Sequence, residues 1–138
     1  MIFNKCIPEL DVTNLKRALD FYLLCGFKIE YERKEDKFAF LSLEGTQLML
    51  QELSEENKWY VGNLEYPFGR GINFQVEVDD VESIYNKLKE NNYKIAFPME
   101  ENWYRDGNLL LGCKEFLVQD PDGYLFRFQS DLGCKNVI

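Results

Sequence analysis

The chain repeats its own pattern at a fixed spacing of 66 residues. Val12 and Val78 each end an apolar run, and Leu15 and Val81 each open a stretch with helical periodicity. The same offset relates further pairs: Ala18 and Ile84, Leu19 and Tyr85, Gly26 and Asn92, and Phe27-Lys28-Ile29 and Tyr93-Lys94-Ile95. A constant offset through three elements predicts two tandem copies of one supersecondary unit.

Each copy has the pattern strand, helix, strand, strand, strand. In the first copy, Asn14 or Thr13 is the expected cap of a helix whose apolar face is Leu15, Ala18, Leu19, Tyr22 and Leu23. Strands are expected over residues 6–12, 27–33, 38–43 and 46–52. In the second copy, Asp79 or Asp80 caps the helix, and strands are expected over 72–78, 93–97 and both sides of a final turn.

Two stretches lack a clear period. Residues 53–70 are predicted to link the copies, and their aromatic side chains either cover a site or a partner surface, such as a neighbouring chain, or simply pack: Trp59, Tyr60, Tyr66 and Phe68. Residues 98–112 are predicted to form a looser stretch that carries about 12 extra residues of the second copy.

The final hairpin, Glu115 to Gln129, turns at Asp120-Pro121-Asp122-Gly123, a sequence suited to a tight turn. In the run after it, apolar Tyr124, Phe126 and Phe128 alternate with Leu125, Arg127 and Gln129. Asn73, Gln75 and Glu77 likewise alternate with Phe74, Val76 and Val78. The alternation predicts a sheet with one apolar face for helix cover and one polar face. That polar face is either a ligand-accepting surface or an ordinary solvent-facing side.

The net charge of −8 disfavours nucleic acid and anionic membrane surfaces as partners and favours a cationic ligand over an anionic one. A merely solvated acidic surface is the alternative. No run reaches the roughly 18 apolar residues of a membrane span, and the N-terminus lacks the apolar core of a signal peptide. The four cysteines form no CxxC pair, so reduced thiols and a cytoplasmic location are expected.

Three segments carry a family resemblance: Leu15 to Tyr22 followed by Cys25-Gly26-Phe27, Gly45 to Leu50, and Glu115 to Tyr124. They resemble the vicinal oxygen chelate superfamily, which includes glyoxalase I, extradiol dioxygenases, and fosfomycin- and bleomycin-resistance proteins. The resemblance implies a single α+β domain over residues 1–138, made of two βαβββ modules, 1–62 and 63–138. Their mixed sheet is expected to curve into a cup, with the helices outside and the ligand inside.

The resemblance also locates the positions that hold a metal in the enzymes of the superfamily. They are occupied here by Ile7, Met49, Asn73 and Arg127. Isoleucine has no donor atom, methionine is a soft neutral ligand, and arginine brings a fixed positive charge. The chain has no histidine, and the carboxylates Glu9, Asp11 and Glu77 lie off these positions. We therefore expect no metal, no cofactor, and neither glyoxalase I, dioxygenase nor fosfomycin-transferase activity.

Length, acidity and the missing metal ligands make the chain similar to the metal-free bleomycin-resistance proteins. That similarity implies a homodimer that binds and sequesters a small organic compound, aromatic and cationic, such as a glycopeptide antibiotic. One departure is that Leu110-Leu111-Gly112-Cys113 stands where some of those proteins carry a stacking tryptophan. The expected ligand-binding residues are Phe38, Met49, Trp59, Asn73, Gln75, Trp103, Tyr104, Leu111 and Arg127, with Glu9, Glu77 and Asp11 as the acidic groups.

Two other functions remain open from the sequence. One is a metal-independent enzyme of the lyase or isomerase kind, with Arg127 and a carboxylate as its acid–base pair. The other is a regulatory or orphan member that binds an anionic ligand through Arg127.

Overall fold

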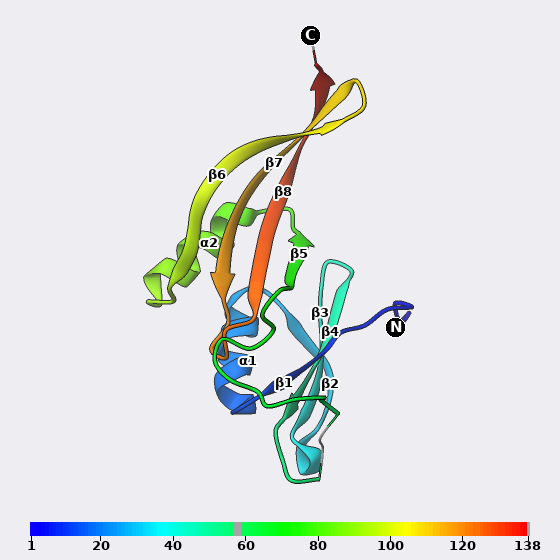
Figure 1. The fold of residues 1–138 in the computed structure, drawn as a ribbon, viewed down its shortest axis with the longest axis vertical. Coiled ribbons are helices and arrows are strands. Elements are labelled where there is room, and N and C mark those ends of the chain that lie inside the picture. The colour runs from blue at the N-terminus through cyan, green and yellow to red at the C-terminus, as the bar shows by residue number, and fades with distance from the viewer. Residues whose placement is uncertain (57–58, 138) are drawn as a thin grey trace. The chain divides into compact units, whose positions relative to one another are not determined.

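The computed structural model describes residues 1–56 and 59–137, and its contacts divide the chain into two compact units (Figure 1). Unit 1 is Met1–Arg70 together with Asp120–Tyr124, and unit 2 is Gly71–Gln119 with the chain from Leu125 onward. Residues 57 and 58 of the predicted linker and residue 138 lie outside the described part. The described residues of 53–70 form neither helix nor strand.

Unit 1 contains one helix and one four-stranded sheet. Its elements are β1 (Glu9–Val12), α1 (Leu15–Leu24), β2 (Lys28–Arg33), the 3-10 turn η1 (Lys34–Asp36), β3 (Phe38–Leu43) and β4 (Thr46–Glu52). The strand order is β1-β4-β3-β2. β1 pairs with β4 in parallel, and the other pairs are antiparallel.

Unit 2 repeats this plan. Its elements are β5 (Asn73–Glu77), α2 (Val81–Glu90), β6 (Ile95–Asp106), β7 (Leu109–Gln119) and β8 (Leu125–Asn136), in the sheet order β5-β8-β7-β6. Again the first strand is parallel to the last, and the other pairs are antiparallel. Both helices have 10 residues and begin 66 positions apart, which confirms the α+β class and the tandem βαβββ modules.

The helix ends follow the predicted chemistry. Asn14 caps α1 by accepting a hydrogen bond from a backbone N–H of the first turn, and Asp80 caps α2 in the same way. Gly26 and Asn92 follow the helices with φ of 103° and 63°, the left-handed conformation that glycine and asparagine tolerate best. Neither of the helices described here is long and apolar enough to cross a bilayer.

The apolar face of α1 differs from the prediction at one residue. Leu15, Ala18 and Tyr22 are buried, but Leu23 is 45% exposed and Phe21 is buried in its place. A helix turns about 100° per residue, so Leu23 lies roughly 140° from the centre of the buried stripe. The predicted face was therefore too wide on the Leu23 side.

The prediction of a looser stretch over residues 98–112 is wrong. These residues belong to a long hairpin in which β6 and β7 pair from Ile95 opposite Val118 to Asp106 opposite Leu109. The register shifts twice between Ile95 and Glu100. Such shifts, next to a proline, break the two-residue alternation that identifies a strand in a sequence. The extra residues of the second module lengthen this hairpin.

The sheet of unit 2 has one buried and one open face, as the alternation predicted. Its buried face consists of Val76, Phe116, Val118, Phe126 and Phe128. The helix α2 packs on β6, β7 and β8 with the ring of Tyr85 on that of Phe116, their centroids 4.9 Å apart. The open face therefore carries the alternate side chains of each strand, which point away from α2 and are mostly polar.

Candidate ligand-binding site

The open face of unit 2 presents its side chains in rows across four strands. Strand register sets each row, because cross-strand partners on one face stand next to each other. One row is Gln75, Arg127, Leu117 and Phe97, and the next is Glu77, Gln129, Glu115 and Glu100. The rows combine amides, carboxylates, one guanidinium and apolar side chains on a single surface.

Glu115 is the buried centre of this face, with 3% of its surface exposed. Its Oε2 accepts hydrogen bonds from the Tyr104 hydroxyl and, at 2.8 Å, from Asn102 Nδ2. Its Oε1 lies 3.6 Å from Arg127 Nη1, an ion pair beyond hydrogen-bond distance. Within the described residues, Glu115 Oε1 and Arg127 Nε are buried atoms without a hydrogen-bond partner. The pair is thus compensated in charge but incomplete in hydrogen bonding.

These contacts fix the charge states of the face. Burial acts to raise the pKa of Glu115, but the hydrogen bonds from Tyr104 and Asn102 and the charge of Arg127 outweigh it, so the pKa is lowered. The hydrogen bond to Glu115 raises the pKa of Tyr104. Burial, with the nearby Glu115 carboxylate, raises the pKa of Cys113 to about 11. At neutral pH the carboxylate is ionised, and the phenol and the thiol are protonated.

Two adjoining hollows open on this face. The first, of about 290 Å³, is lined by Asn73, Phe97, Pro98, Glu100, Asn102, Tyr104, Glu115, Leu117 and Arg127. The second, of about 390 Å³, is lined by Gln75, Glu77, Tyr104, Leu111, Gly112, Cys113, Arg127, Gln129 and Asp131. Tyr104 and Arg127 line both. The two hollows together contain four carboxylates and one guanidinium, so the surface is acidic.

Unit 1 has a hollow of its own, of about 280 Å³, lined by Glu9, Asp11, Arg33, Asp36, Phe38, Gln51, Glu56 and Trp59. The Arg33 guanidinium lies 4.1 Å from the centre of the Phe38 ring. Burial and the charge of Asp11 raise the pKa of Glu9, and burial raises the pKa of Asp11. This hollow combines aromatic and acidic side chains, as the sequence suggested for a binding surface.

The predicted site residues fall into three groups. Phe38 and Trp59 line the hollow of unit 1, as do Glu9 and Asp11. The hollows of unit 2 include Asn73, Gln75, Tyr104, Leu111, Arg127 and Glu77. Met49 and Trp103 line none of these three hollows. A ligand contact remains a prediction for each of these residues.

Trp103 lies next to Tyr104 on β6, so the two side chains leave opposite faces of the strand. Its indole donates a hydrogen bond to Glu101, and Lys135 Nζ lies 3.9 Å from the ring centre. The ring covers Gly112, where any Cβ would come within 2.6 Å of it. The Trp103 ring therefore packs on the backbone of Gly112, and its ligand contact remains a prediction.

Glu115 was not among the residues expected from the sequence. Counting outward from the turn would have found it, because β7 and β8 pair Leu117 with Arg127 and Glu115 with Gln129. Glu115 therefore shares the face of Arg127, one row further from the turn. The missed signal was a carboxylate in register with the polar residues of the last strand.

The residues at the metal positions of the superfamily do not fit a divalent ion. Asn73 offers a single amide oxygen, and Arg127 brings a cation already paired with Glu115. Met49 offers one soft sulfur atom, and Ile7 has no donor atom. No group of three or more His, Cys, Asp or Glu residues suited to a metal occurs in the part of the chain that the structure describes.

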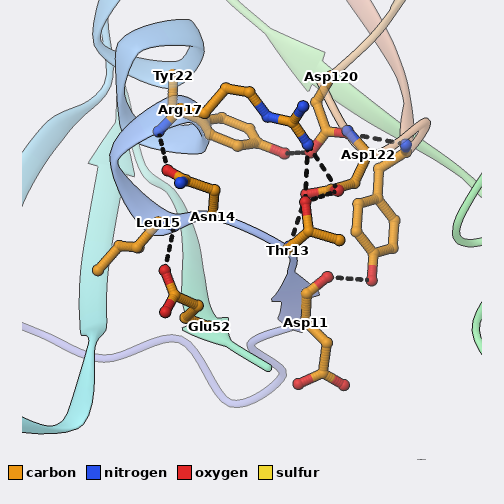
Figure 2. Close-up of polar contacts among 10 residues, drawn as sticks. Asp11, Thr13, Asn14, Leu15, Arg17, Tyr22, Glu52, Asp120 and Asp122 are labelled. Carbon is orange, nitrogen blue, oxygen red and sulfur yellow. Dashed lines mark hydrogen bonds and ion pairs between the residues drawn. The ribbon is translucent and has the colours of Figure 1, made fainter. Parts of the chain in front are cut away.

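The final turn holds two more buried carboxylates, both within unit 1 (Figure 2). Asp122 accepts hydrogen bonds from the Thr13 backbone N–H and hydroxyl, at 3.2 and 2.6 Å, and from Arg17 Nη2 at 3.3 Å. Asp120 accepts the Tyr22 hydroxyl at 2.5 Å. Burial raises the pKa of Asp120 to about 6, against partly compensating hydrogen bonds. Because these carboxylates accept hydrogen bonds from α1 and from Thr13 just before its cap, they stabilise the fold and are poor candidates for ligand contacts.

The fold and the open, acidic face define a class: α+β proteins built from tandem βαβββ modules that present polar surfaces suited to small ligands. The family model described as Glyoxalase/Bleomycin resistance protein/Dioxygenase superfamily matches residues 8–128. The chain therefore belongs to the glyoxalase/bleomycin resistance protein/dioxygenase superfamily, and the resemblance noted in the sequence is confirmed.

Several solved structures are similar to this chain. A superfamily member from Vibrio splendidus 12B01 is 35% identical over 91% of this chain and 97% of its own, with a TM-score of 0.43. TioX from Micromonospora sp. ML1 is 20% identical over 94% and 100%, with a TM-score of 0.69. A glyoxalase/bleomycin resistance protein/dioxygenase from Alicyclobacillus acidocaldarius is 21% identical over 94% and 92%, with a TM-score of 0.61. The last two show the fold alone.

Proposed function

We propose that this protein binds and sequesters a small organic compound without a metal ion, and that the ligand carries an aromatic ring and a positive charge. The observation that carries the proposal is the pairing of Arg127 with Glu115 on the open face of unit 2. An unpaired Arg127 would repel a cationic ligand. Its ion pair with the buried Glu115 carboxylate offsets that positive charge.

The remaining charges of the face then favour a cation. Glu77, Glu100 and Asp131 line the hollows and are exposed. The rings of Tyr104 and Phe97 are also accessible, at 48% and 59%. A flat ring on such side chains gains about 0.5–1.5 kcal/mol beyond burial, and a cation over a ring about 0.5–2 kcal/mol. A compound with both features matches the surface best.

Binding is favoured over catalysis by the charge states of the central groups. A general acid or base works best with a pKa near the working pH. The lowered pKa of Glu115 and the raised pKa values of Tyr104 and Cys113 move all three groups away from neutrality. Arginine does not release its proton in proteins. The Arg127–carboxylate pair is thus better suited to holding a ligand than to moving a proton.

The test is calorimetric titration of the untagged protein with a cationic glycopeptide such as bleomycin and with planar carboxylates, each at low and high salt. Arg127→Gln is the variant, and Arg105→Gln is its matched control, because Arg105 is exposed on β6 and lines neither hollow. We expect the cation to bind, more weakly at high salt. It should bind more tightly to Arg127→Gln, since the variant leaves Glu115 uncompensated. Binding of carboxylates alone, abolished in Arg127→Gln, would show that the ligand has the opposite charge.

We also propose that the protein is a homodimer. Support comes from exposed apolar side chains in the segment 53–70 of unit 1, including Trp59 at 90% and Tyr66 at 62% exposure. Such groups are typical of protein–protein contacts when they gather on one segment. Sedimentation at micromolar concentration is expected to give twice the 16.4 kDa chain mass, and a purely monomeric boundary would contradict the proposal.

A further inference from the structure

We infer that the ligand is elongated and spans both hollows of unit 2, with its ring in the first and its positive charge in the second, between Glu77 and Asp131. This inference rests on the proposed function and adds the layout of the ligand. The hollows measure about 290 and 390 Å³, and each alone is near the lower limit of ligand sites. Because they share Tyr104 and Arg127, one molecule can occupy both.

The two hollows differ in chemistry. Phe97, Pro98 and Leu117 give the first an apolar wall suited to a ring. The second contains the exposed carboxylates Glu77 and Asp131, and neither forms an ion pair with the residues that the structure describes. An ion pair with a ligand cation is therefore available in the second hollow.

The strand register gives the span. Leu117 pairs with Arg127, Arg127 pairs with Gln75, and Glu77 lies two residues further along β5. With strands about 4.8 Å apart and a rise of about 3.3 Å per residue, the Cα atoms of Leu117 and Glu77 are roughly 12 Å apart. The charge of the ligand must therefore be several bonds away from its ring.

Glu115 supplies the second observation that points to a ligand. It is 3% exposed, it lines the first hollow, and its Oε1 accepts no hydrogen bond in the described structure. A buried carboxylate oxygen without a donor is costly. Among the described residues, its negative charge is met only by Arg127 Nη1 at 3.6 Å, so this oxygen adds to the attraction of the two hollows for a ligand cation.

The experiment uses phenylhexylamine, which carries a ring and a distant ammonium group, with three companion probes. Phenylhexanol has the same length without charge, benzylamine has the charge close to the ring, and bleomycin tests the proposed function itself. Each is titrated into the untagged wild type and into Glu77→Gln, Asp131→Asn, Glu115→Gln and Arg127→Gln. Glu90→Gln is the matched control, because Glu90 is exposed at the end of α2 and lines neither hollow.

We expect phenylhexylamine to bind about five- to tenfold more tightly than phenylhexanol or benzylamine, from ion pairs with two exposed carboxylates. Glu77→Gln and Asp131→Asn should each reduce that preference by about two- to fivefold, and Glu90→Gln should leave it unchanged. The two members of the central ion pair should act in opposite directions: Glu115→Gln weakens binding of the amine, and Arg127→Gln strengthens it. A merely structural role of the pair would make both variants weaker binders.

Two results would overturn the layout. In one, the alcohol or benzylamine binds as tightly as phenylhexylamine. In the other, Glu77→Gln and Glu90→Gln behave alike. If bleomycin still binds in either case, the layout is wrong and the proposed function stands. If neither bleomycin nor phenylhexylamine binds, both proposals fail.

Discussion

Replacing Tyr22 with phenylalanine removes one hydrogen bond from the contact that joins the final turn to α1 (Figure 2). Tyr22 is completely buried, and its hydroxyl donates to Asp120 Oδ2 at 2.5 Å. The other oxygen of Asp120 accepts the backbone N–H groups of Asp122 and Tyr124, each at 2.9 Å. Tyr22→Phe therefore leaves one carboxylate oxygen buried without this donor, while the packing of the ring is kept.

The loss depends on pH in a way that follows from the pKa of Asp120. Hydrogen bonds to a charged group contribute about 1.5–3 kcal/mol, and those between neutral groups about 1 kcal/mol. Because the pKa is about 6, the carboxylate is charged at about pH 8 and mostly protonated at about pH 5. Tyr22→Phe should lower the free energy of unfolding by about 2–3 kcal/mol at the higher pH and by about 1 kcal/mol at the lower.

The assay is urea unfolding followed by circular dichroism at both pH values. Tyr31→Phe is the control, because Tyr31 stacks on Phe40 but its hydroxyl has no hydrogen bond with the described residues. The control should change the free energy of unfolding by less than about 0.5 kcal/mol. Equal losses for Tyr22→Phe at the two pH values would show that the charge of Asp120 does not set the strength of this hydrogen bond.

Three further substitutions test the final turn and the β6–β7 hairpin. Asp120→Asn should remove one pH dependence of the free energy of unfolding. Folding raises the pKa of the Asp120 carboxyl from 3.8 to about 6. Its stabilising contribution is therefore present below pH 3.8 and is lost as the pH rises through about 6. The total is about 3 kcal/mol, of which about 2–2.5 kcal/mol is lost between about pH 4 and pH 7, so the variant should gain that smaller amount relative to wild type over this range in urea unfolding; parallel curves would contradict it. Gly123→Ala should destabilise by at least about 1–2 kcal/mol, since φ is 99° and a Cβ would come within 2.5 Å of Pro67; an unchanged unfolding midpoint would count against it. Gly112→Ala should displace the Trp103 ring, and a shift in tryptophan fluorescence is expected.

The parts of the fold that depend on local chemistry were predictable from the sequence. Asn14 and Asp80 are short polar side chains placed before an apolar helical stripe, and Gly26 and Asn92 tolerate the left-handed conformation that ends each helix. Their constant spacing identified the module repeat. These signals act within a few residues, so they do not depend on the rest of the chain.

The parts that depend on pairing between distant strands were not predictable in this way. The β6–β7 hairpin has no continuous alternation because its register shifts near Pro98. The burial of Glu115 follows from the side chains of Tyr104 and Arg127, which belong to two other strands. A carboxylate in a strand is normally exposed, so only the register reveals its position beside Arg127.

The proposed function requires that the protein binds an organic molecule with no metal in its site. The most direct measurement is native mass spectrometry of the untagged protein purified from its own host. We predict a protein that carries an organic molecule, released intact on activation and seen as a positive ion, with no bound transition metal. A stoichiometric zinc, nickel, manganese or iron ion held by the protein would contradict the claim.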